Sequence, residues 1–152
     1  MNDAEIIVDD KVPVVRIIRE FDAPPEKVFR AHVDPGLFVQ WNWSDDYTVT
    51  FDEFDCRTGG AYRITMSGPE MAGSVHGSFH DVVPNERIVQ TFSPDGLPDL
   101  VVLERHTFED LGDGRTRLTA QSLVESYEHR DAFLDAELAE GWARLDDLLS
   151  AL

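Results

Sequence analysis

Residues 12–29 have the sequence VPVVRIIREFDAPPEKVF, and this stretch decides how the fold begins. Its first part, 12–21, is rich in β-branched residues, which favour a strand, and Pro13 lies near the exposed start of that strand. The DAPPE run at 22–26 then supplies a cap residue, prolines for a first helical turn and an acid that suits a helix N-terminus. The stretch therefore predicts a strand followed directly by a short helix.

A second helix and a series of strands follow. The Asp34-Pro35 pair repeats the helix-start signal, and the apolar stripe of a second short helix follows at Leu37, Phe38 and Trp41. Beyond this helix the apolar period changes to two, which predicts six strands at 47–52, 61–66, 72–83, 87–93, 100–109 and 116–124. Because short turns link these strands, we expect neighbours to pair antiparallel.

The last segment, about 128–152, carries the clearest helical pattern. Apolar residues recur there at spacings of three and four, at Leu134, Leu138, Trp142, Leu145, Leu148 and Leu152. We predict one continuous helix over most of 130–150. The whole pattern indicates an α+β fold, in which a curved antiparallel sheet of about seven strands wraps around the long C-terminal helix. Residues 1–11 are predicted to be an acidic tail and residues 12–152 a single domain.

The charge composition limits the choice of partners. The chain has 13 Lys and Arg against 30 Asp and Glu, a formal net charge of −17. Such a field repels phosphate backbones and anionic lipid headgroups, which argues against nucleic acid and acidic membranes as partners. No secretory signal and no apolar run of about 18 residues is visible. Since Cys56 is the one cysteine, we expect a cytoplasmic protein without a disulfide framework.

The histidines do not indicate a metal site. His76 and His80 are four residues apart, which is a helical spacing for two ligands of one metal, but both fall on a predicted strand. On a strand their positions would be about 13 Å apart, too far to hold one ion. We therefore expect neither a metal nor another cofactor.

Five short motifs occur in order along the chain. They are RxFDAPPEKVF at 19–29, DPxxxxxW at 34–41, DCRTGG at 55–60, a spaced set from Gly77 to Pro84 (with Phe79, Asp81 and Val82), and GWxxLxxL at 141–148. This ordered set resembles the START-like (SRPBCC, helix-grip) superfamily. More narrowly, it resembles the family named after the activator of heat-shock-protein-90 ATPase, in the part that corresponds to the C-terminal domain. The resemblance implies the helix-grip fold. Related START-like domains bind lipids, polyketides, steroids or hormones, a few are cyclases, and the family takes its name from co-chaperones.

Large apolar side chains are the first candidates for a binding site. Trp41 and Trp43 lie beside a polar loop at 44–46, and we expect this segment at the mouth of an apolar cavity between sheet and helix. The candidates of this kind are Phe38, Trp41, Trp43, Phe51, Tyr62, Met66, Phe79, Phe92 and Trp142. The alternative is that each is an ordinary core residue.

Three polar residues complete the predicted site. On the predicted strand 100–109, Glu104 and His106 alternate with the same face as apolar neighbours, and antiparallel pairing brings Ser122 to that face. Inside a cavity, the pKa values of a buried Glu and His would shift by desolvation. The alternatives are an internally satisfied pair or an inverted strand face. A hydrolytic triad is disfavoured, because the sequence has no nucleophile elbow around Ser122. We assign no catalytic residue.

Three functions remain open from the sequence. The first, which we favour, is binding of a small, largely apolar molecule of the lipid or polyketide kind. The second is a cyclase or isomerase that uses His106 or Glu104 as general acid or base in the same cavity. The third is a chaperone-like protein-interaction domain that acts through an exposed apolar patch. The sequence leaves open whether the protein is a monomer or a homodimer.

Overall fold

The computed structural model describes residues 4–136 and 140–152, which form eight strands and four helices. In chain order the elements are β1 (Glu5–Val8), β2 (Val14–Phe21), α1 (Pro25–Val33), α2 (Pro35–Asn42), β3 (Thr48–Phe54), β4 (Ala61–Ser67), β5 (Ala72–Val83), β6 (Arg87–Pro94), β7 (Val102–Gly112), β8 (Arg115–Leu123), α3 (Tyr127–Ala136) and α4 (Glu140–Ala151). The predicted order of a strand, two short helices, further strands and C-terminal helical structure is confirmed.

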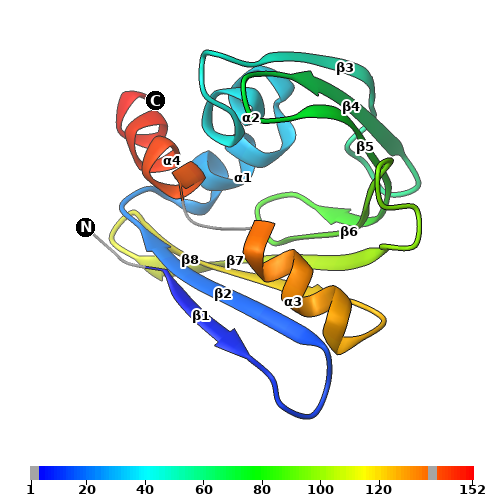
Figure 1. Cartoon of the computed structure of the whole chain (residues 1–152). Coiled ribbons are helices and arrows are strands. Elements are labelled where there is room, and N and C mark those ends of the chain that lie inside the picture. The colour runs from blue at the N-terminus through cyan, green and yellow to red at the C-terminus, as the bar shows by residue number, and fades with distance from the viewer. Residues whose placement is uncertain (1–3, 137–139) are drawn as a thin grey trace.

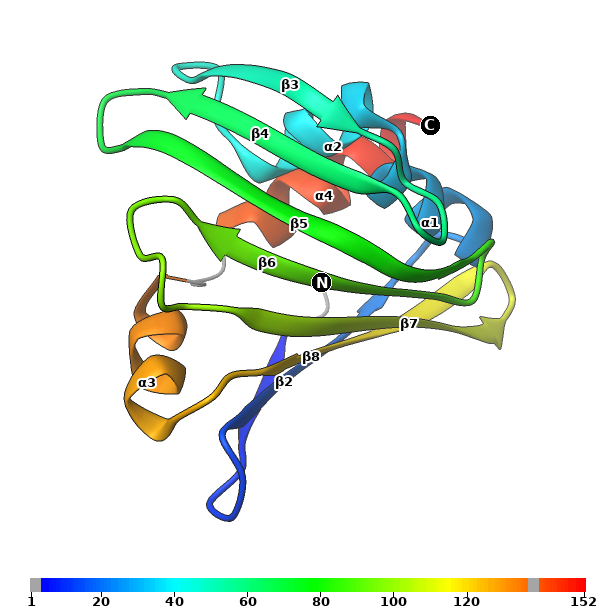
Figure 2. The same ribbon diagram turned by 90° about the vertical axis from the view of Figure 1, so that its right-hand side faces the viewer.

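The strands form one antiparallel sheet in the order β1-β2-β8-β7-β6-β5-β4-β3. The sheet is curved, and α1, α2 and α4 lie within the curve, between the β3 edge and the β1 edge of the sheet (Figure 1; Figure 2). This arrangement is the predicted α+β helix-grip fold. The inner face of the sheet therefore looks onto helices, and a side chain there is buried only where a helix covers it.

The N-terminal segment differs from the expectation. Residues 5–8, which we expected within an acidic tail, form β1 and pair antiparallel with β2 along Glu5–Val8. The sheet consequently has eight strands rather than about seven. The four residues EIIV are apolar enough to pair at an edge, and the acids at positions 9 and 10 follow the strand rather than preventing it.

The C-terminal helical segment also differs from the expectation of one helix. The structure describes two helices, α3 and α4, and residues 137–139, over which continuity was predicted, lie outside the described residues. The two helices occupy different places. In both views α3 lies beside the lower part of the sheet, whereas α4 lies against α1 and α2 (Figure 1; Figure 2). Of the two described C-terminal helices, α4 is the one that the sheet encloses together with the two short helices.

The helix starts follow the sequence only in part. Asp34 caps α2 as its sequence predicts, since its side chain accepts hydrogen bonds from the N–H groups of Gly36 and Leu37. Asp22 does not cap α1. That helix begins after Pro24, which makes no side-chain cap bond, and Pro25 occupies the first helical turn.

A buried ion pair attaches α4 to the sheet. Arg19 of β2 is only 5% exposed and donates to Asp146 of α4 over 2.6 Å. The Arg19 guanidinium also lies 5.3 Å from the ring centre of Phe21 and 6.0 Å from that of Trp142. On its other side α4 donates from Arg144 to the carbonyl oxygen of Trp41, at the end of α2. These bonds fix the helix that carries Trp142 relative to both layers.

Candidate functional site

Aromatic rings from α2 and α4 meet at the centre of the helical layer. Trp41 is 7% exposed, stacks on the half-buried Trp142 at 5.8 Å and 25°, and donates from Nε1 to the carbonyl oxygen of Ala31. Phe38 lies one helical turn away and contacts both Trp41 and Trp43 edge to face. The Trp41–Trp43 segment thus joins the aromatic cluster, and Trp43 is the more exposed of the two indoles.

The aromatic cluster continues onto β3, β4 and β5. Phe38 reaches Phe51 at 6.4 Å, and further along the sheet Tyr62 contacts Phe79 at 5.3 Å. Met66 is buried in the same cluster. Phe92 is the exception among the predicted apolar residues, because it packs against a separate small cluster of Leu100, Val102 and Val124. The structure therefore brings together eight of the nine predicted apolar residues, and leaves Phe92 apart.

The predicted polar residues lie on the inner face of β7 and β8. Glu104 pairs across the strands with Ser122, and His106 pairs with Ala120. Their alternate neighbours Val102 and Phe108 are buried, which identifies the face as the inner one. Ser122 is itself 8% exposed, and Glu104 accepts a hydrogen bond from Gln90 of β6 over 3.2 Å.

A second histidine, His32 of α1, lies directly against His106. The two imidazole ring centres are 5.7 Å apart, and His32 also contacts Trp41 at 5.0 Å and Phe108 at 5.1 Å. His32 is 6% exposed, and its Nδ1 lies 2.7 Å from the carbonyl oxygen of Val28. Within the described residues, neither His32 Nε2 nor His106 Nδ1 has a hydrogen-bond partner, although both atoms are buried.

Burial keeps both imidazoles neutral. Desolvation lowers the pKa of His32 to about 4, against a smaller opposing effect of the bond to Val28. Desolvation also lowers the pKa of His106 to about 3, and the nearby His32 adds to this effect. An imidazole with such a pKa is uncharged near neutral pH, so each ring offers one N–H donor and one lone pair.

Tyr62 forms a polar link between the aromatic cluster and β6. Its hydroxyl donates to the carbonyl oxygen of Thr91 over 2.7 Å. The ring reaches β6 across Gly77 of β5, where a Cβ atom would collide with the Thr91 carbonyl and lie 2.6 Å from Tyr62 Cε1. Burial raises the pKa of Tyr62, and the charge of Glu104 raises it further. The phenol is therefore a neutral donor.

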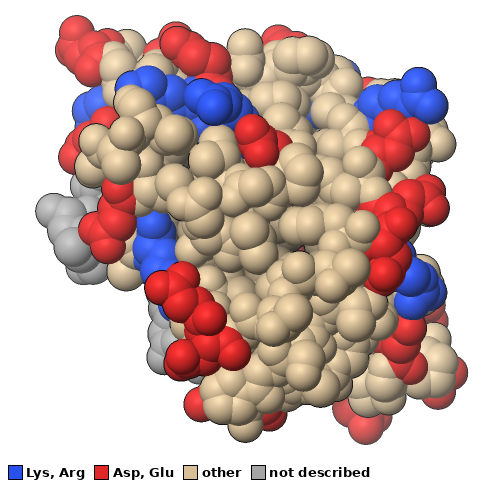
Figure 3. Space-filling view, turned by 90° about the horizontal axis from the view of Figure 1, so that it is seen from above, with Lys and Arg blue, Asp and Glu red and all other residues tan. Residues whose placement is uncertain are grey.

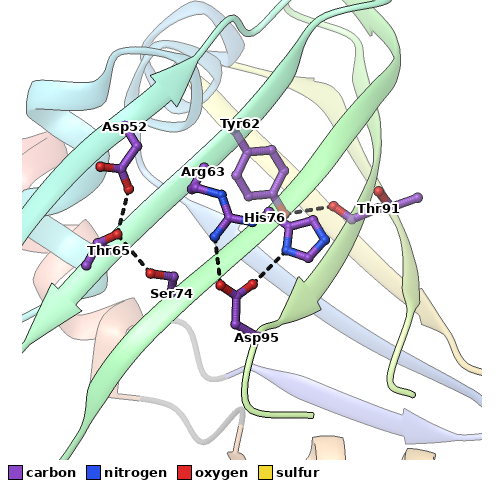
Figure 4. Close-up of polar contacts among 8 residues, drawn as sticks. All are labelled: Asp52, Tyr62, Arg63, Thr65, Ser74, His76, Thr91 and Asp95. Atoms are coloured by element: carbon purple, nitrogen blue, oxygen red, sulfur yellow. Dashed lines mark hydrogen bonds and ion pairs between the residues drawn. The ribbon is translucent and has the colours of Figure 1, made fainter. Parts of the chain in front are cut away.

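The outer face of the sheet carries a different polar group, which Figure 4 shows. Asp95 accepts from Arg63 over 2.7 Å and contacts His76 over 2.9 Å, while Thr65 links Asp52 to Ser74. The Arg63, His76 and Asp95 side chains are each more than 40% exposed, so this network is a solvated surface feature. No group of three or more His, Cys, Asp or Glu residues in the described part of the chain has a metal-binding arrangement. Burial raises the pKa of the Cys56 thiol to about 12, which makes it unreactive as a nucleophile.

The surface charge is unevenly distributed. Figure 3 views the molecule from above, where β3 and α2 lie uppermost, and charged side chains, most of them acidic, gather around the rim of this face while uncharged residues cover most of its centre. In addition, no described helix is both long and apolar enough to cross a membrane.

Sequence reasoning missed His32 and Gln90, although a signal existed for both. His32 follows Val28 by four residues and Phe29 by three, so it lies on the same stripe of α1 as these buried side chains. Gln90 lies between Ile88 and Phe92 in a strand of period two. Both residues are polar and were therefore not counted among the inward positions.

The comparisons with known proteins agree with this fold. No curated protein matches the chain. A solved structure from Rhodobacter sphaeroides is 25% identical, with a TM-score of 0.83 over 97% of this chain and 99% of that one. One from Chromobacterium violaceum is 26% identical, with a TM-score of 0.74 over 90% and 96%. A solution structure from Arthrobacter aurescens is 23% identical, with a TM-score of 0.82 over 97% and 92%. Residues 22–152 match the model of the family described as activator of Hsp90 ATPase homolog 1-like protein, and the chain belongs to this START-like family.

Proposed function

We propose that this protein is a binding domain for a small, largely apolar molecule held between the inner face of the sheet and the helices α1, α2 and α4. One observation carries the proposal. In an interior built from aromatic rings, two buried imidazole nitrogens, His32 Nε2 and His106 Nδ1, have no hydrogen-bond partner among the described residues. Buried polar atoms are normally paired, and an unpaired one costs about 1–3 kcal/mol. Mostly apolar walls with a few polar groups are typical of ligand sites.

Catalysis in the same place is the weaker candidate. A general acid or base works best with a pKa near the working pH, whereas burial lowers the pKa of His32 to about 4 and that of His106 to about 3. Glu104 is engaged by Gln90, and Ser122 lies across from Glu104 rather than from a histidine. The geometry supports recognition by hydrogen bonding more than proton transfer.

A protein-partner function is the second candidate, and the surface offers one feature for it. The family takes its description from an activator of Hsp90 ATPase. Val101, Leu103 and Leu123 are 40%, 43% and 38% exposed, and the last two pair directly across β7 and β8. Such a patch would suit a protein contact. It does not explain the unpaired buried nitrogens, which a partner on the outer face would not reach.

The test is binding of uncharged apolar probes, monitored by tryptophan fluorescence and melting temperature. Trp41 stacks on Trp142 and touches His32, so a ligand beside His32 should change indole emission. A ligand that binds only the folded state raises the melting temperature by mass action. We expect a response from flat aromatic polyketides or steroids.

A matched pair of variants locates the response. Ala120 faces inward across from His106, whereas its neighbour Thr119 points to the opposite face of β8. Ala120→Leu should abolish binding by placing a larger side chain beside His106, and Thr119→Leu should leave binding unchanged, provided that both variants melt cooperatively. Native mass spectrometry of protein from its own host should show a bound small molecule. If no probe or natural ligand binds, or if both leucine variants bind equally well, the proposal is wrong and the protein-partner function takes its place.

A further inference from the structure

The His32–His106 pair has a hydrogen-bonding pattern that its protonation state defines. His32 Nδ1 contacts the Val28 carbonyl oxygen, which can only accept, so the ring proton is on Nδ1. Because the ring is neutral, Nε2 then carries a lone pair and can only accept. This atom belongs to a side chain that is 94% buried, counted from its exposed fraction of 6%, and it has no partner among the described residues.

The neighbouring ring supplies the second buried nitrogen. His106 comes from β7 while His32 comes from α1, and the two ring centres are 5.7 Å apart with an angle of 59° between their planes. The nitrogens do not bond each other. Because the two ring centres are only 5.7 Å apart, a group that donates to His32 Nε2 would lie close to the His106 ring.

We propose that the His32–His106 pair recognises a hydroxyl group, alcoholic or phenolic, on an otherwise apolar ligand. This inference rests on the proposed function and adds the chemical class of the ligand. The hydroxyl proton is donated to His32 Nε2, and the hydroxyl oxygen is placed beside His106. A hydroxyl is the smallest organic group that both donates and accepts, and it needs no charge on the protein.

The surroundings select against charged ligands. A carboxylate cannot donate to His32 Nε2, and it would bring a second negative charge into the interior that holds Glu104. Arg19, a buried cation on the inner face, is already bonded to Asp146. A protein of net charge −17 adds long-range repulsion against any anion. Fatty acids are thus poor candidates, and neutral alcohols and phenols are favoured.

The adjacent rings favour a flat ligand body. Trp41 and Phe108 lie 5.0 Å and 5.1 Å from the centre of His32, and Phe29 packs edge to face on Phe108 at 5.5 Å. Aromatic rings at such spacings stack well on further aromatic surface. Among hydroxylated molecules, phenols are therefore the better fit.

Three probes that differ in a single group test the inference. They are 2-naphthol, its methyl ether 2-methoxynaphthalene, and 2-naphthoate, each titrated into the full chain at about pH 8 with tryptophan emission and calorimetry as readouts. We expect wild type to bind 2-naphthol about tenfold more tightly than the methyl ether, because the ether leaves His32 Nε2 unpaired. The naphthoate should bind more weakly than the naphthol.

Variants then assign the preference to the pair. His32→Phe keeps the ring contacts with Trp41 and Phe108 but removes the acceptor, and should bring the ratio of the two dissociation constants close to one. His106→Phe provides a second variant should the first fail to fold, and His80→Gln, on the exposed side of β5, is the matched control. Equal binding of naphthol and ether by wild type would overturn the inference while leaving the binding function intact. Tighter binding of naphthoate than of naphthol, or a preference for naphthol that survives both variants, would have the same consequence. Absence of binding by all three probes would count against the binding function itself.

Discussion

Mild acid should destabilise the protein through the two buried histidines. In an unfolded chain each imidazole has a pKa near 6.5, whereas in the folded protein the pKa is about 4 for His32 and about 3 for His106. Between about pH 6.5 and pH 4 the unfolded state therefore binds more protons than the folded state. Stability consequently falls as the pH falls through this window, and it is fully present above about pH 7.

The magnitude follows from these pKa values. At about pH 5, a histidine with a folded-state pKa of about 4 or below lowers the free energy of unfolding by about 2 kcal/mol relative to pH 8. His32 and His106 together should contribute about 4 kcal/mol, since each histidine contributes about 2 kcal/mol. That is a large share of the about 5–15 kcal/mol that holds a typical domain together.

Urea denaturation, followed by tryptophan fluorescence at several pH values between about 8 and 5, measures this loss. His32→Phe should remove about half of it, since a phenylalanine cannot take up a proton. His80→Gln is the control, because His80 is exposed, and it should leave the pH dependence as in wild type. A change in the wild-type free energy of unfolding below about 1 kcal/mol over this range, or an equal effect of His80→Gln, would refute the reasoning.

Three further substitutions test how the helical layer and the sheet are held together, each by chemical denaturation. Trp142→Ala should cost about 3 kcal/mol, because it removes the ring that stacks on Trp41, and a loss below about 1 kcal/mol would mean that this contact carries little stability. Asp146→Asn should cost about 3 kcal/mol by weakening the bond to the buried Arg19, whereas the exposed Asp147→Asn should have little effect; equal losses would contradict the role of this ion pair. Gly77→Ala should cost more than about 2 kcal/mol, because the new Cβ would collide with the Thr91 carbonyl and displace Tyr62, and wild-type stability of this variant would show that β5 and β6 separate easily.

Side-chain periodicity in the sequence was sufficient to predict most of the sheet and its inner face. The alternation through Val102, Glu104, His106 and Phe108 predicted that these side chains point inward together, because successive side chains of a strand point to opposite faces of the sheet. This alternation does not say where on the inner face a side chain lies. For that reason Phe92 was grouped with aromatic residues that it does not contact. Whether any of these residues binds a ligand stays a prediction.

The features that sequence reasoning missed depend on contacts between distant segments. β1 exists because the short run Ile6-Ile7-Val8 pairs with the edge of β2, and a run of this length within an acidic segment is a weak strand signal by itself. His32 becomes important only because α1 packs across β7 and brings it to His106, some seventy positions further along the chain, a separation that no local pattern encodes. A polar residue on an apolar helical stripe is the signal that sequence reading should retain in such folds.

The histidine pair also separates stability from function. If its two unpaired nitrogens served only the fold, apolar residues would serve better, because a buried polar atom without a partner costs about 1–3 kcal/mol. We therefore expect His106→Leu to raise the free energy of unfolding by about 1 kcal/mol at pH 8 in the absence of ligand, and by more at pH 5, where wild type also loses stability through protonation. The same variant should lose the preference for 2-naphthol over its methyl ether.

A variant that is less stable than wild type at both pH values would show that His106 is a structural residue, and the case for a recognition site would then depend on His32 alone. If the histidine is kept for binding at the expense of the fold, its replacement must raise stability and remove the ligand preference together.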